Sequence, residues 1–88
     1  MDDALNLRAV TAAIRHEPFM EEDLVMHEGI RWVKFNALQA CRRRFSHHPV
    51  DDMQEAMRAE TDRTGHKRFI FHTDSEGVSW VASPKRPG

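Results

Sequence analysis

Proline and glycine residues divide this chain into short segments, and that division limits the folds it can adopt. Proline disfavours helical geometry in the residue before it, and glycine favours turns and the ends of helices. We therefore expect a succession of short helices and strands. The 88 residues fit one small domain with one core. The dividing residues are Pro18, Gly29, Pro49, Gly65 and Gly77.

The first segment has the apolar periodicity of a helix. Leu7, Val10 and Ile14 are spaced i, i+3 and i+7, so one face of a helix would carry all three. We predict a helix over residues 3–16 that ends before Pro18.

The next segments have the composition of β-strands. Residues 24–26 and 30–35 are apolar and rich in β-formers, and they flank Gly29. At least one strand is expected there. Residues 24–26 are either a lengthened part of that strand or one arm of an added hairpin.

A second helix is predicted immediately after these strands. Asn36 is a favourable N-cap, and the residues after it carry one apolar stripe down to Phe45. Residues 46–49 then break the helix. The stripe consists of Ala37, Leu38, Cys41 and Phe45.

A third helix and a hairpin complete the expected order. The helix starts at Pro49, has acids in its first turn and runs to about Thr64, where Gly65 supplies the stop. Residues 68–73 and 78–82 are β-rich runs around a glycine-containing turn, which is typical of a β-hairpin. The predicted core is Leu7, Val10, Ile14, Trp32, Phe35, Leu38, Cys41, Phe45, Met53, Met57, Phe69, Phe71 and Trp80.

This order of elements resembles the winged helix-turn-helix family. The strand of residues 32–35 leads directly into the helix at Asn36, residues 46–49 form a short break, and residues 69–82 correspond to the wing. The resemblance implies an α+β fold of three helices with a C-terminal β-hairpin wing. Residues 1–82 would form the single domain, and residues 83–88 a disordered tail or the start of a linker. The main alternative is an α+β domain with a three- or four-stranded antiparallel sheet under the helices.

Composition places limits on the function. The 13 Lys+Arg and 14 Asp+Glu residues give a net charge of −1, which argues against coating nucleic acid through bulk positive charge. No charge-free stretch approaches the roughly 20 apolar residues of a membrane span, and the acidic start is unlike a signal peptide. We expect an intracellular protein, cytoplasmic or nuclear, without membrane contact. The single cysteine, Cys41, allows no internal disulfide.

The leading functional expectation is a small non-catalytic regulator that binds nucleic acid. The resemblance implies that the third helix enters the major groove, but that helix is rich in acids that repel phosphate. The basic run at residues 42–44 is the stronger candidate. The alternative is that these arginines only stabilise the fold, because the helix dipole favours cations at a helix C-terminus and nearby acids can pair with them. The nucleic-acid-binding candidates are Arg42, Arg43, Arg44, His47, Gln54, Arg58, Lys67 and Arg68.

The alternative is a protein–protein adaptor or inhibitor. The acidic third helix would meet a basic partner, or the hairpin edge would pair with a strand of the partner. Such a protein could also be a dimer. The partner-binding candidates are Asp51, Asp52, Glu55 and Asp62.

Catalysis, a cofactor and a metal are not expected. The chain has no glycine-rich phosphate loop, no nucleophile elbow and no zinc-ligand spacing. His47 and His48 are adjacent and therefore point apart, and Cys41 falls on an apolar stripe.

Overall fold

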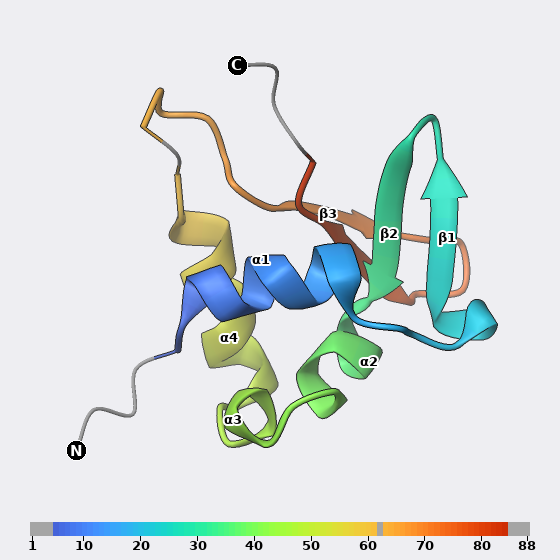
Figure 1. Ribbon diagram of the computed structural model, residues 1–88, viewed down its shortest axis with the longest axis horizontal. Coiled ribbons are helices and arrows are strands. Elements are labelled where there is room, and N and C mark those ends of the chain that lie inside the picture. The colour runs from blue at the N-terminus through green and yellow to red at the C-terminus, as the bar shows by residue number, and fades with distance from the viewer. Residues whose placement is uncertain (1–4, 62, 85–88) are drawn as a thin grey trace.

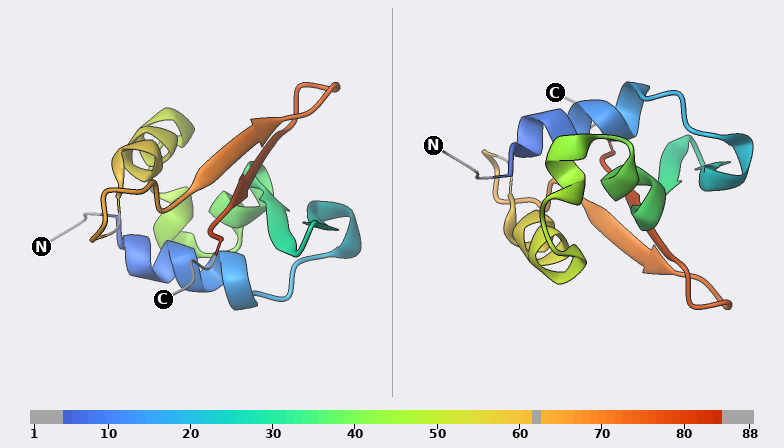
Figure 2. Two further views of the ribbon diagram at one scale, coloured as in Figure 1. Left: turned by 90° about the horizontal axis from the view of Figure 1, so that it is seen from above. Right: turned by 90° about the horizontal axis from the view of Figure 1, so that it is seen from below.

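The computed structural model describes residues 5–61 and 63–84, which build helices on one antiparallel sheet (Figure 1). The sheet has four strands in the order β1-β2-β4-β3. The four α-helices of the described residues gather on one side of it (Figure 2), so the fold is α+β, as predicted. The elements are α1 (Leu7–His16), the 3-10 helix η1 (Glu21–Asp23), β1 (Leu24–His27), β2 (Ile30–Lys34), α2 (Phe35–Ala40), α3 (Arg43–Ser46), α4 (Val50–Ala59), β3 (Ile70–Thr73) and β4 (Ser79–Ala82).

Helix α1 begins where a side chain satisfies its first free amides. The Oδ1 atom of Asn6 accepts hydrogen bonds from the backbone N–H groups of Arg8 and Ala9, at 3.0 and 3.2 Å. At the other end Glu17 is extended, so the predicted boundary before Pro18 is confirmed. The predicted start at Asp3 is wrong for residues 5 and 6, because Asn6 is extended and caps a helix that begins at Leu7. Residues 3 and 4 lie outside the described residues.

The β-rich segment near Gly29 forms a complete hairpin. β1 and β2 are antiparallel, and their turn has positive φ at both central residues, 51° at Glu28 and 77° at Gly29. Turns of this kind match the twist of the strands they connect. Of the two possibilities for residues 24–26, the structure therefore contains the added hairpin.

The predicted second helix is wrong in its start and in its continuity. α2 begins at Phe35 with Lys34 as its N-cap, so Asn36 lies inside the first turn. Arg42 is extended, with φ −140° and ψ 139°, and separates α2 from α3, giving four α-helices instead of three. Phe45 is nevertheless only 1% exposed, because the break redirects α3 while its aromatic side chain stays in the core.

Helix α4 is shorter than predicted. Glu60 is extended, and its carbonyl accepts a hydrogen bond from the backbone N–H of Arg68 at 3.2 Å. Thr61 forms an antiparallel bridge with Lys67. Gly65, with φ 86°, therefore lies in the loop between these paired segments and does not end the helix.

One face of the sheet packs on the helices and forms the core. Val33 of β2 is paired with Val81 of β4, which is paired with Phe71 of β3. Because directly paired residues of neighbouring strands point to the same face of a sheet, these three share one side. The buried cluster consists of Val10, Ala13, Ile14, Val33, Phe35, Leu38, Phe45, Met53, Met57, Phe69 and Val81, with Leu7, Cys41 and Phe71 partly buried against it.

Two predicted core residues, Trp32 and Trp80, lie elsewhere. Each directly precedes a fully buried valine of its strand, Val33 or Val81, so the pleat points each indole to the opposite face. Both are only half-buried. The prediction that they share the core is therefore wrong, and the α-helices of residues 5–61 and 63–84 lie on the opposite face of the sheet (Figure 2).

Candidate binding surface on the open face of the sheet

Side chains from all four strands and one loop meet on the open face of the sheet. Strand pairing places Val25 beside Trp32 and His72 beside Trp80. Together with two neighbours they line a hollow of about 490 Å³, which we term the aromatic hollow. It is lined by Val25, His27, Trp32, His72, Asp74 and Trp80.

The rings of the hollow are close enough to interact. The centroids of Trp32 and His72 are 6.2 Å apart with an interplanar angle of 65°, an edge-to-face arrangement. Trp32 belongs to β2 and His72 to β3, so this contact spans the central strand β4. Ala82 of β4 faces the same side as Trp80 and is fully buried.

Asp74 fixes the position of Trp80. Its Oδ1 atom accepts hydrogen bonds from the backbone N–H groups of Glu76 and Val78, and its Oδ2 atom accepts one from the indole Nε1–H of Trp80, each at 2.9 Å. The Trp80 hydrogen bond is the main reason why the pKa of Asp74 is lowered, with a further contribution from Val78. The hollow therefore contains an ionised carboxylate at neutral pH.

A cation already lies over one of the indoles. The Nζ atom of Lys34 is 5.7 Å from the ring centroid of Trp80, within the range of a cation–π interaction. The same Nζ is 3.9 Å from Oδ1 of Asp23, which balances its charge.

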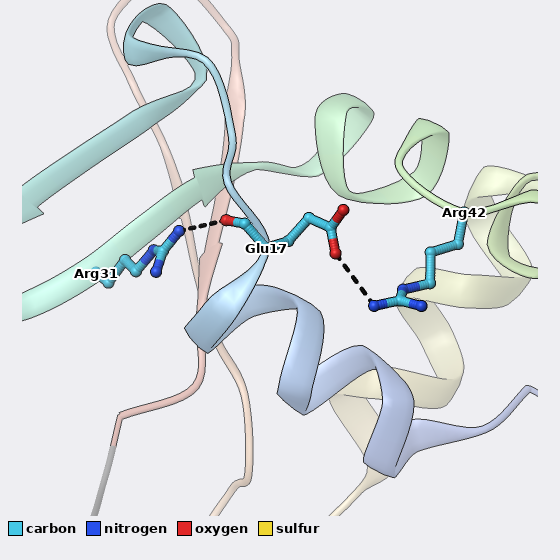
Figure 3. Close-up of polar contacts among 3 residues, drawn as sticks. All are labelled: Glu17, Arg31 and Arg42. Carbon is cyan, nitrogen blue, oxygen red and sulfur yellow. Dashed lines mark hydrogen bonds and ion pairs between the residues drawn. The ribbon is translucent and has the colours of Figure 1, made fainter.

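Arg42, a nucleic-acid candidate, makes a contact within the fold. Its Nη2 atom is 3.1 Å from Oε2 of Glu17 (Figure 3). The carbonyl of Glu17 also accepts a hydrogen bond from Arg31 of β2, whose guanidinium donates to the carbonyl of Arg15 as well. Glu17 therefore connects the end of α1 to both the sheet and the α2–α3 junction.

The structure does not bring the remaining basic candidates into one patch. Arg43 and Arg44 belong to α3, just before α4, whereas Nζ of Lys67 donates to the carbonyl of Arg58 at the far end of α4. A helix of 10 residues is about 15 Å long, so α4 separates the two groups. His47 is exposed beside α3, and Arg68 is half-buried.

The other candidates on α4 differ in their surroundings. The Arg58 guanidinium lies 4.2 Å from the ring centroid of Phe71, and Gln54 lines a small hollow with Val78. The acids proposed for protein binding, Asp51, Asp52 and Glu55, are exposed on the helix. Asp62 lies outside the described residues.

The described residues offer little for metal or thiolate chemistry. Among them, no group of three His, Cys, Asp or Glu side chains is arranged to hold a metal ion. Burial raises the pKa of the Cys41 thiol, and the charge of Glu17 raises it further, so the thiol stays protonated at neutral pH. Within the same residues, no helix combines the length and apolar character that crossing a membrane requires.

The aromatic hollow was missed by sequence reasoning, although one signal was present. Ile30, Trp32 and Lys34 alternate with Arg31 and Val33, which is the pattern of a strand with two different faces. Assigning both tryptophans to the core overrode that alternation.

Comparisons with known proteins identify no relative. No protein-family model, curated protein or solved structure matches this chain. What the fold and the surface define is an α+β domain with one open, aromatic sheet face.

Proposed function

We propose that this chain is a non-catalytic binding module of the winged helix-turn-helix type, and that it binds a protein partner through the aromatic hollow. The order of elements supports the architecture: β2 leads directly into α2, and the hairpin β3–β4 follows α4 with β4 paired to β2. The hairpin β1–β2 extends this arrangement by one strand.

The observation that carries the protein-binding proposal is the position of Trp32 and Trp80 on the face of the sheet that the α-helices of the described residues leave uncovered. Indoles have a large apolar surface, and tryptophan is enriched among the residues that contribute most to protein–protein binding. Here the core is complete without them, since Val33 and Val81 are fully buried on the other side of the sheet.

The charges near the hollow favour a protein over a nucleic acid. Asp74 lies in its wall. The β1–β2 turn carries Glu28, and the β3–β4 turn carries Glu76. Carboxylates at these positions would repel phosphate groups, whereas they suit a partner with basic side chains.

Site-specific crosslinking tests this assignment. A photo-reactive amino acid at Val25, in the wall of the hollow, should crosslink a protein, and one at Glu55 on α4 serves as the matched control. The purified partner should bind Trp32→Ser about thirtyfold more weakly than the parent, as at an interface hot spot. Two results would reject the hollow as the interface: crosslinks to protein at position 55 but not at position 25, or equal affinity of the partner for the parent and for Trp32→Ser.

A second candidate function is nucleic-acid binding at α3. Its support is that Arg43 and Arg44 are exposed, and no ion pair engages either one among the residues described. Duplex DNA should then bind with an affinity that falls steeply with salt, and Arg43→Glu/Arg44→Glu should lower the salt slope by about two units. Fluorescence anisotropy at two salt concentrations measures this. An identical slope in the variant would exclude these arginines as phosphate contacts.

A further inference from the structure

We propose that the aromatic hollow is a site for an organic cation, namely the guanidinium or ammonium group of an arginine or lysine side chain presented by the partner. This inference rests on the proposed protein-binding function and specifies the chemistry of its central contact.

The π surfaces of the hollow are suited to a cation. Tryptophan has the most favourable ring for cation–π contacts, and the hollow contains the two tryptophans of the chain, Trp32 and Trp80. Lys34, the cross-strand partner of Trp80, already places its Nζ atom 5.7 Å from the centroid of that ring, so the surface accommodates a cation. Since Asp23 balances the Lys34 charge, that pair adds little net repulsion toward an incoming cation.

The carboxylate of Asp74 provides the opposite charge. Its oxygens offer about four acceptor positions, and three hydrogen bonds hold it in place, from Glu76, Val78 and Trp80. One position therefore remains for a donor of the ligand. An arginine or lysine side chain can lay its methylene groups along Val25 and Trp32 while its charged end approaches Asp74.

A neutral apolar side chain fits the hollow less well. Covering Asp74 with an apolar group would remove water from a carboxylate without supplying a new partner, which costs free energy. A cation supplies that partner and a charge of the opposite sign. The volume of about 490 Å³ is sufficient for one long side chain.

NMR titration tests the site with a defined probe. The chain has two tryptophans, so its indole N–H region should contain two signals. N-acetyl-arginine methylamide should shift both in a saturable manner at tens of millimolar or below. N-acetyl-citrulline methylamide, which has nearly the same shape and no charge, should bind at least about fivefold more weakly. Equal shifts from both compounds, or none, would overturn the cation site.

Variants locate the binding and separate the two proposals. Trp32→Leu keeps an apolar side chain but removes a π face, and it should weaken arginine binding at least about fivefold, whereas Met26→Leu on the other face of β1 should not change it. Equal weakening by both variants would count against the hollow. If crosslinking at Val25 succeeds while citrulline binds as well as arginine, the protein interface stands and the cation site fails. If arginine binds but no protein crosslinks at Val25, the cation site stands and the proposed function fails.

Discussion

At the scale of single residues, the direction of a side chain decides its role more than its size does. Trp32 and Val33 are neighbours in β2, yet one lines the open hollow and the other is fully buried. Leu38 is likewise fully buried, whereas Met20 is 66% exposed. Apolar residues of comparable size should therefore contribute very differently to stability.

The first prediction compares those two residues. Leu38→Ala leaves a cavity in the core and should lower the free energy of unfolding by about 2–5 kcal/mol. Met20→Ala should change it by no more than about 0.5 kcal/mol, because the side chain is mostly in water. Urea denaturation followed by circular dichroism measures both. If Leu38→Ala lowered the free energy of unfolding as little as Met20→Ala does, the stripe of α2 would not face the core.

The second prediction concerns the pH dependence that Asp74 contributes. Its pKa is lowered from 3.8 in the folded protein, chiefly by the Trp80 hydrogen bond, so its contribution to stability is present above about pH 4 and is lost as the pH falls through the lowered folded pKa. Asp74→Asn should therefore be less stable than the parent at neutral pH, and the difference should shrink in acid. Urea titrations of both proteins at neutral pH and near pH 3 test this, because a constant difference would assign the effect to geometry rather than to charge.

At the scale of elements, local patterns predicted the strands and helices but not every junction. The β-rich composition around Gly29 was sufficient to predict at least one strand, and the glycine-containing turn between residues 68–73 and 78–82 was sufficient to predict a hairpin. By contrast, residues 36–45 carry an unbroken helical pattern, yet Arg42 is extended and pairs with Glu17, which is 25 positions away in the chain. A contact of that kind depends on tertiary structure, and no local pattern encodes it.

The third prediction ranks two arginines that contact the same junction. Arg31 donates to the carbonyls of Arg15 and Glu17 at the C-terminal end of α1, and its guanidinium is partly buried, whereas Arg42 forms a largely exposed pair with Glu17. Arg31→Met should cost about 1.5–3 kcal/mol because it leaves those carbonyls without a charged donor. Arg42→Met should cost less than about 1 kcal/mol. Thermal and urea unfolding of the two variants give the ranking, and the reverse order would contradict it.

At the scale of the whole molecule, the sheet order assembles a surface from distant parts of the chain. β1 and β3 are the two edges, and each contributes side chains to a hollow whose tryptophans come from the two central strands, β2 and β4. The class of fold follows from the order of elements along the chain. The hollow requires in addition the pairing of β4 with both β2 and β3, which the sequence alone does not specify.

The last prediction is that this surface has one mobile wall and one rigid wall. β4 is hydrogen-bonded on both sides, whereas β1 pairs only with β2 and leaves Val25 44% and Met26 64% exposed. Segments with few buried apolar contacts open at lower free energy than the core. Amides of β1 should therefore exchange with solvent at least about tenfold faster than the paired amides of β4 in native-state hydrogen exchange. Uniform protection would instead make β1 part of the single cooperative unit.

Binding of a ligand should change this difference. Val25 and His27 belong to β1, whereas Trp80 is held by Asp74, so a ligand would close the β1 side of the hollow onto a fixed indole. Its binding should therefore slow amide exchange in β1 more than in β4.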